Sequence, residues 1–221
     1  MPRRFLDGDG RRARLGIVVP SVNTVMEPWA QRTVPAGVSK AAIRQLSSVF
    51  PDVIAYGCTA SSIVQGFDYD SHLRAEITET YKVASTTAAH AILTAADTLG
   101  ARRISIVSPY TKEVDAAEHC YFESAGLEVL GGAFLGISDS FRLAEPEPGT
   151  LFELARKGFD PRSDALIMTC LNTRSHTVID RLEKTLGKPV ITSTQATLWH
   201  ALRLAGIADR ITGFGRLLEA H

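Results

Sequence analysis

The sequence has 221 residues, of which 45% are hydrophobic and 22% charged, so the chain can bury a sizeable core and is not mainly disordered. Its 24 basic residues balance its 24 acidic residues, and this zero net charge gives no attraction to nucleic acid or to an anionic membrane. We therefore expect a small neutral or anionic metabolite as its partner. Neutral charge also does not oppose a homo-oligomer.

The chain contains no apolar run as long as a membrane span, and its Arg-rich residues 1–14 lack the apolar stretch of a signal peptide. These features predict a cytoplasmic protein. Its three cysteines, an odd number without a Cys-x-x-Cys pair, predict free thiols and not a disulfide framework. The histidines and cysteines show no metal-ligand spacing, and Gly131-Gly132 lacks the spacing of a dinucleotide loop, so we predict neither metal nor cofactor.

In chain order, the first predicted element is a buried strand over residues 15–19, a β-branched run closed by Pro20-Ser21. A second strand runs from Asp52 towards Cys58, and a third interrupts a helical stretch near Lys82. Further helices are predicted over residues 71–99, 113–125, 149–157, 176–186 and 195–205, with glycines 100, 126, 187 and 206 at their C-terminal caps.

Three sequence patterns recur in the same order in the two parts of the chain. The first is an arginine before an apolar strand, with a proline six positions later. The second is an aspartate before an apolar run that ends in a cysteine, and the third is a valine before a Ser/Thr-rich helix start. The matched residues are Arg14 and Arg103, Asp52 and Asp164, and Val83 and Val190, the last pair at an offset of 107. Together they indicate a duplicated α/β unit.

The repeats predict an α/β fold of two pseudosymmetric half-domains, each a small parallel sheet flanked by helices, with an active site between them. We expect the halves to cover residues 15–100 and 101–206, with 207–221 packing back on the first half. The first copy is short, because 38 residues separate Arg14 from Asp52 whereas 61 separate Arg103 from Asp164. About 23 residues are therefore missing near Ser39-Lys40: either a strand and a loop are deleted, or a mobile loop is absent from the sequence.

Cys58 and Cys170 end equivalent predicted strands, where open α/β sheets bind ligands. The amides and dipole of a following helix would lower the pKa of each thiol and hold a carboxylate. If the halves are related by a pseudo-twofold axis, the two thiols face each other across one cleft. A free cysteine is more often a buried apolar residue. The equivalence of the pair favours chemistry, whereas Cys120, inside a helical stretch, is predicted to be structural.

Several segments resemble one known family. They are Pro20-Ser-Val-Asn-Thr-Val-Met-Glu27, Tyr56-Gly-Cys-Thr59, Ser108-Pro-Tyr110, Thr169-Cys-Leu-Asn-Thr173 and the segment from Lys188 to His200. In order and spacing they resemble the maleate cis-trans isomerase and arylmalonate decarboxylase branch of the aspartate/glutamate racemase superfamily, over residues 15–207.

This resemblance implies two pseudosymmetric α/β half-domains and an enzyme without metal or organic cofactor. It implies that Cys58 adds to an alkene carbon of maleate or a close dicarboxylate, giving a succinyl-like adduct, while Cys170 handles the proton and elimination releases fumarate. It also implies substrate-binding groups that hold the two carboxylates. These are the Asn23 and Tyr110 side chains, the Thr59 hydroxyl, and the amides after each cysteine, including those of Leu171 and Asn172.

Other reactions on the same scaffold stay open. Arylmalonate decarboxylases keep only the second cysteine, so Cys58 argues against that activity, and amino-acid or hydantoin racemases use two thiols as acid and base. A dicarboxylate-binding protein without catalysis is a third alternative. Ala60 and Ser140 stand where the family has polar residues, which favours a substituted relative of maleate. Glu27 is expected to cap a helix, His200 to be a core histidine, and Arg174 to form a surface ion pair or meet a carboxylate.

Overall fold

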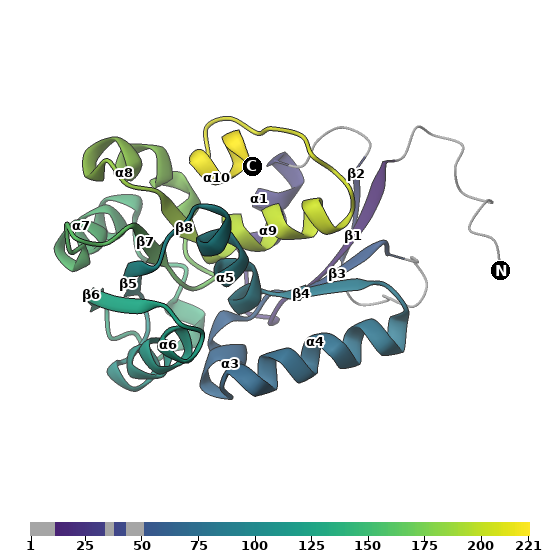
Figure 1. Cartoon of the computed structure of the whole chain (residues 1–221), viewed down its shortest axis with the longest axis horizontal. Coiled ribbons are helices and arrows are strands. Elements are labelled where there is room, and N and C mark those ends of the chain that lie inside the picture. The colour runs from purple at the N-terminus through teal and green to yellow at the C-terminus, as the bar shows by residue number, and fades with distance from the viewer. Residues whose placement is uncertain (1–11, 34–37, 43–50) are drawn as a thin grey trace.

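The computed structural model describes residues 12–33, 38–42 and 51–221. In this part of the chain, two four-stranded parallel sheets are flanked by helices, which confirms the predicted fold class (Figure 1). Within the same residues, no helix is both long and apolar enough to cross a bilayer.

The two sheets have the same topology. The first has the order β2-β1-β3-β4 and the second has the order β6-β5-β7-β8, with every neighbouring pair parallel. The bounds of the first sheet are β1 Ala13–Val18, β2 Val38–Ala42, β3 Val53–Tyr56 and β4 Ala84–Thr87. Those of the second are β5 Arg103–Ser108, β6 Glu128–Phe134, β7 Ala165–Met168 and β8 Val190–Thr192. This correspondence supports the duplication that the sequence repeats indicate.

Helices cover both sheets. They are α1 Met26–Thr33, α3 Thr59–Val64, α4 Phe67–Tyr81, α5 Ala88–Thr98, α6 Lys112–Ser124, α7 Pro148–Gly158, α8 Ile179–Leu186, α9 Ser193–Leu204 and α10 Arg216–Ala220, with short 3-10 helices η3 Ser140–Arg142 and η4 Ser175–Thr177. The predicted break near Lys82 is present, because α4 ends there, β4 follows and α5 begins after Thr87.

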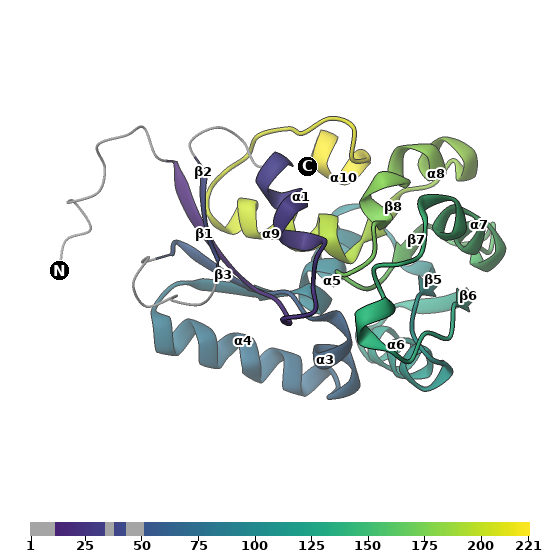
Figure 2. The same ribbon diagram turned by 180° about the vertical axis from the view of Figure 1, so that it is seen from behind.

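The helices α5 and α9 lie at the centre of the molecule, between the two sheets (Figures 1 and 2). They pack against each other, and each also contacts the last strand of both sheets, β4 and β8. Small residues on α5, such as Ala88, Ala91 and Ala95, are fully buried and allow this close approach. One hydrophobic core cluster therefore extends through both sheets, for example from Val53 to Ile191.

The paired arginines and aspartates have the same structural role in both halves. The Asp52 side chain accepts a hydrogen bond from the backbone amide of Arg14 at 2.8 Å, and Asp164 accepts one from the amide of Arg103 at 2.9 Å. Each aspartate thus ties the start of one strand to the start of its neighbour, which explains why this sequence pattern occurs twice.

The shortfall in the first half lies after β2. The connections from β1 to β2, residues 19–37, and from β5 to β6, residues 109–127, have equal length. Residues 43–52 connect β2 to β3, whereas residues 135–164 connect β6 to β7 and include α7. The strand itself, β2, is retained, so the alternative in which a strand is deleted near Lys40 is wrong. Residues 43–50 lie outside the described residues.

Candidate active site

Cys58 is the N-terminal capping residue of α3, directly after β3. It is half-buried, and the amide and hydroxyl of Ser61, one turn into the helix, lie close enough to its sulfur to favour the thiolate, although neither makes a hydrogen bond of normal geometry. The Tyr56 hydroxyl in turn donates to Ser61 Oγ at 3.1 Å. The predicted placement of this thiol between a strand end and a helix start is confirmed.

Cys170 follows β7 and is buried, with 2% of its surface exposed. Its backbone has φ of 79°, a left-handed conformation that is uncommon for a residue with a side chain. The Thr173 hydroxyl donates to the Cys170 carbonyl at 3.0 Å, and a turn leads on to η4. The prediction that a helix begins directly after this cysteine is therefore wrong, and its sulfur receives a hydrogen bond from the Asn172 amide in the turn.

Burial raises the pKa of both thiols. The pKa of Cys58 lies above its ordinary value because desolvation outweighs the opposite effect of the Ser61 amide and hydroxyl. Burial also raises the pKa of Cys170 to about 12, although Tyr110 and the Asn172 amide act in the opposite direction. The sequence-based expectation of lowered thiol pKa values is thus wrong for the substrate-free protein, because it omitted the cost of removing a thiolate from water.

Tyr110 follows β5, which neighbours β7 in the second sheet, and is buried. Its hydroxyl hydrogen-bonds to Cys170, and burial together with the negative thiolate raises its own pKa well above the ordinary value. Tyr110 is therefore a neutral donor. Because Cys58 acts electrostatically on both Tyr110 and Cys170, these three residues form one group at the carboxyl ends of β3, β5 and β7.

Gly57 allows the two cysteine loops to approach each other. A Cβ at this position would lie 2.9 Å from Val19 Cγ1, 3.0 Å from Leu171 Cδ2 and 3.1 Å from the Val18 carbonyl oxygen. The end of β1, the residue before Cys58 and the residue after Cys170 therefore meet at a point where only a hydrogen atom fits.

The two predicted asparagines make hydrogen bonds to the protein. Asn172 accepts from the Thr24 amide at 2.9 Å and donates to the Val22 carbonyl at 3.1 Å, which joins the loop after Cys170 to the loop after β1. Asn23 accepts from the Val25 and Met26 amides at 3.0 and 2.9 Å. Both side chains thus shape the loop beside the thiols.

Thr59 and Leu171 are both buried. The Thr59 hydroxyl donates to Ser193 Oγ, at the start of α9, at 3.0 Å. Its side chain therefore links α3 to the central helix pair, while the Leu171 side chain packs against the core.

The remaining predicted residues separate into surface and core. Arg174 donates to Glu147 at 2.9 Å, which is the ion pair that the sequence left as one of two alternatives. Ser140 is exposed at the start of η3, and Ala60 is half-buried in α3. Cys120 is exposed, so its predicted core role is wrong. The Glu27 side chain lies outside the described part of the structure.

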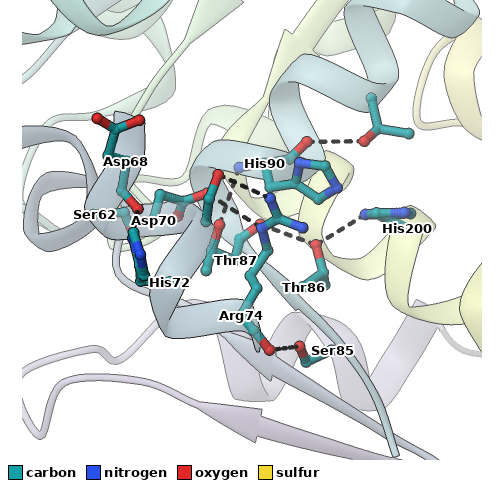
Figure 3. A network of polar contacts seen from close by, with 12 residues as sticks. Ser62, Asp68, Asp70, His72, Arg74, Ser85, Thr86, Thr87, His90 and His200 are labelled. Carbon is teal, nitrogen blue, oxygen red and sulfur yellow. Dashed lines mark hydrogen bonds and ion pairs between the residues drawn. The ribbon is translucent and has the colours of Figure 1, made fainter. Parts of the chain in front are cut away.

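His200 is a core histidine, as predicted, and belongs to a polar network between α4, β4, α5 and α9 (Figure 3). Its Nδ1 lies 2.9 Å from Thr86 Oγ1, and its ring packs on that of His90 with centroids 5.4 Å apart. Burial lowers the pKa of each histidine to about 4, with Arg74 adding to the effect. This network was not predicted beyond His200.

Sequence reasoning also missed Glu118, which is fully buried on α6 and acts electrostatically on Cys170 and Tyr110. A signal for it exists, because Glu118 precedes Tyr121 and Phe122 by three and four positions and so shares their buried helix face. Among the described residues, no group of three His, Cys, Asp or Glu side chains is placed to hold a metal ion.

Comparison with known proteins places this geometry in context. A sequence model of a family described as arylmalonate decarboxylase matches residues 24–218. An arylmalonate decarboxylase from Bordetella bronchiseptica is 28% identical over 179 residues, covering 80% of this chain and 75% of that protein. A maleate isomerase from Geobacillus stearothermophilus is 25% identical over 249 aligned residues, covering 93% and 97% of the two chains.

A solved structure gives the same fold. A mutant of the Nocardia farcinica maleate cis-trans isomerase, with a covalently bound succinylcysteine intermediate, has a TM-score of 0.89 at 21% identity and covers 95% of this chain and 99% of that one. The alignment with the Geobacillus protein is longer than the 221 residues of this chain, so that relative has segments without a counterpart here.

Proposed function

Because the chain belongs to the arylmalonate decarboxylase family, we propose that it is a cofactor-independent cis-trans isomerase that converts maleate, or a close dicarboxylate, to fumarate. The observation that carries this proposal is the second thiol. Cys58 acts electrostatically on Cys170 and on Tyr110, which places the two thiols near each other, so one thiol can add to a carbon while the other exchanges a proton.

The reaction balances with these two thiols. The Cys58 thiolate forms a C–S bond to one alkene carbon, and the π electrons move onto the adjacent carboxylate as an enediolate. The Cys170 thiol gives its proton to the neighbouring carbon and becomes a thiolate, which leaves a single bond that can rotate. Cys170 then removes the proton, the C–S bond breaks, and fumarate leaves with the Cys58 thiolate restored.

The environment of each thiol suits its role. Cys58 is half-buried, so its proton can exchange with water, and the two donors on Ser61 favour the thiolate. Cys170 is fully buried and holds its proton, with Tyr110 placed to donate to its sulfur once the proton has moved. A covalent succinylcysteine of the kind proposed here is present in the Nocardia isomerase, whose fold this chain shares.

A decarboxylase acting on an arylmalonate is the second candidate, and the Bordetella relative favours it. In that reaction a single thiol, Cys170, would protonate the carbanion that remains after loss of carbon dioxide. Cys58 would then have no chemical role. The two candidates therefore differ in their dependence on Cys58.

We would follow maleate in heavy water by proton NMR with the wild-type protein and with Cys58→Ala and Cys170→Ala. Cys120→Ala is the matched control, since this third thiol is exposed on α6. Fumarate from the wild type and from Cys120→Ala, with a loss of at least about 10³-fold in the other two variants, is the expected result. Equal turnover by Cys58→Ala would contradict the isomerase, and arylmalonate decarboxylation that survives this substitution would establish the alternative.

A further inference from the structure

Glu118 is a buried carboxyl group that the proposed reaction does not use. It lies on α6 with none of its surface exposed, and neither carboxyl oxygen has a hydrogen-bond partner of normal geometry. A carboxylate buried in this way is costly, because it loses water without gaining a cation or a hydrogen bond of normal geometry.

The Glu118 carboxyl group lies near Cys170 and Tyr110, which follow β7 and β5 of the second sheet. The hydroxyls of Ser108, at the end of β5, and Thr169, directly before Cys170, lie close enough to favour its ionised form, although neither makes a hydrogen bond of normal geometry. A negative charge on Glu118 acts on Cys170 and on Tyr110, raising the pKa of both. Ionised Glu118 would therefore oppose a thiolate on Cys170.

We propose that Glu118 is a positioning residue that remains protonated beside Cys170, so that this thiol can carry negative charge during turnover. A neutral acid there offers its proton to the hydroxyls of Ser108 and Thr169, whereas a carboxylate would add a second negative charge next to the thiolate. The inference rests on the proposed function, since it assigns Cys170 a thiolate stage.

The surrounding groups agree with a neutral Glu118. Burial is the largest cause that raises its pKa, to about 8, and Asp115 on the same helix adds to it. The other ionisable groups that face the carboxyl are Tyr110 and Cys170. Between its bounds α3 has no ionisable side chain, and on β6 the one such residue, Glu128, is exposed.

Two measurements test this directly. In the wild type, infrared spectroscopy should show a protonated buried carboxyl group at pH 6.5 that disappears as the pH rises through about 8 and is absent in Glu118→Gln. In protein labelled with ¹³Cβ cysteine, Glu118→Gln should lower the pKa of Cys170 by at least about one unit, because glutamine cannot acquire the charge that raises it. Turnover of the wild type should decline above about pH 8, and that decline should be absent in Glu118→Gln.

Glu123→Gln is the control, because Glu123 is exposed on the same helix, and it should change neither the thiol titration nor the pH profile. The absence of a protonated carboxyl group in the wild type at pH 6.5 would overturn the proposal, and this measurement does not depend on folding of a variant. An unchanged Cys170 titration in folded Glu118→Gln would overturn it equally. Since neither titration requires turnover, a protein that is inactive on maleate yet shows both shifts would refute only the proposed reaction.

Discussion

Cys58 and Cys170 show how burial competes with hydrogen bonding at a single residue. The Ser61 amide and hydroxyl favour the thiolate of Cys58, and Tyr110 and the Asn172 amide favour that of Cys170, yet desolvation is the larger influence and both pKa values rise. Both thiols are therefore mainly protonated near neutral pH. In the proposed reaction, the Cys58 thiolate forms when substrate binds or in a small fraction of molecules.

Tyr110→Phe tests the donor that opposes burial at Cys170. Without the hydroxyl, the pKa of Cys170 should rise further, because the hydrogen bond from Tyr110 lowers it, and turnover should fall about 10²-fold. The pKa is measured by ¹³Cβ NMR and the turnover by steady-state kinetics. Tyr69→Phe, at an exposed position on α4, is the matched control, and a Tyr110→Phe variant with the same Cys170 pKa as the wild type would show that this contact has no such role.

The sequence located Cys58 and Cys170 because each follows an apolar strand, a pattern visible along the chain, whereas Tyr110 was implied only by the family resemblance. It could not show their protonation, since the desolvation of a thiol depends on the elements that cover it. Glu118 was missed because its neighbours Asp115, Glu123 and Glu113 make α6 read as a charged surface helix. Its burial follows from the packing of α6 against other elements, among them α3 and β6.

Among the elements, α5 and α9 contribute to the polar network around His200, and only His200 itself was predicted as a core residue. Each begins at a threonine whose side chain accepts a backbone hydrogen bond, Thr87 from the His90 amide and Thr192 from the Gln195 amide. These caps show that the two helix starts correspond at Thr87 and Thr192, so the offset of 107 predicted from Val83 and Val190 is too large by two positions. Apolar and Ser/Thr-rich runs of the two repeats can be aligned at several offsets. The helix caps and the strand pairing determine which offset is correct.

His200→Gln should reduce the loss of stability in acid. The pKa of His200 is about 4 in the folded protein, below the ordinary 6.5, so unfolding takes up a proton between these values and stability falls as the pH decreases from 6.5 towards 4. The substitution should lower the proton uptake on unfolding at pH 5 by about one. Urea unfolding between pH 4.5 and 7 measures this uptake, with His221→Gln, at the exposed end of the chain, as the control. An unchanged pH dependence would mean that His200 is already protonated in the folded state.

At the scale of the whole molecule, the junction at Gly57 decides how closely the two cysteine loops approach. The wall of this junction includes a backbone carbonyl, that of Val18, which cannot rotate away from an added methyl group. The fold class and the repeated sheet were predictable, because alternating strands and helices favour parallel sheets. The close approach of Gly57 and Leu171 was not predictable, because it depends on how the two sheets are placed relative to each other. The sequence pattern indicates each sheet but not their relative placement.

Gly57→Ala should destabilise the protein by about 1–3 kcal/mol, the usual cost of overpacking a buried site. Gly149→Ala on α7 is the matched control, because a Cβ there meets no atom within 4 Å, and it should leave stability unchanged or raise it slightly. Urea unfolding of both variants provides the comparison. Equal midpoints for Gly57→Ala and the wild type would show that the two loops can separate without cost.

The proposed halves, residues 15–100 and 101–206, are linked more tightly than such a division suggests. The segment after residue 206 contacts both, since Phe214 packs edge-on against Trp29 of α1 with ring centroids 5.4 Å apart and the Gly215 amide donates to Asp180 of α8 at 2.8 Å. The division therefore describes the repeat, while one of the two hydrophobic clusters extends through both halves.

The exchange of contacts between α5 and α9, each of which packs on both sheets, is relevant to how this molecule evolved. Each of these helices contacts the last strand of its own sheet and that of the other sheet. A half released by itself would expose the face that its counterpart's helix covers, and two copies of one half would restore both contacts by associating about a twofold axis. Gene duplication would then have joined an existing symmetric dimer, in which Cys58 and Cys170 were originally one residue present twice.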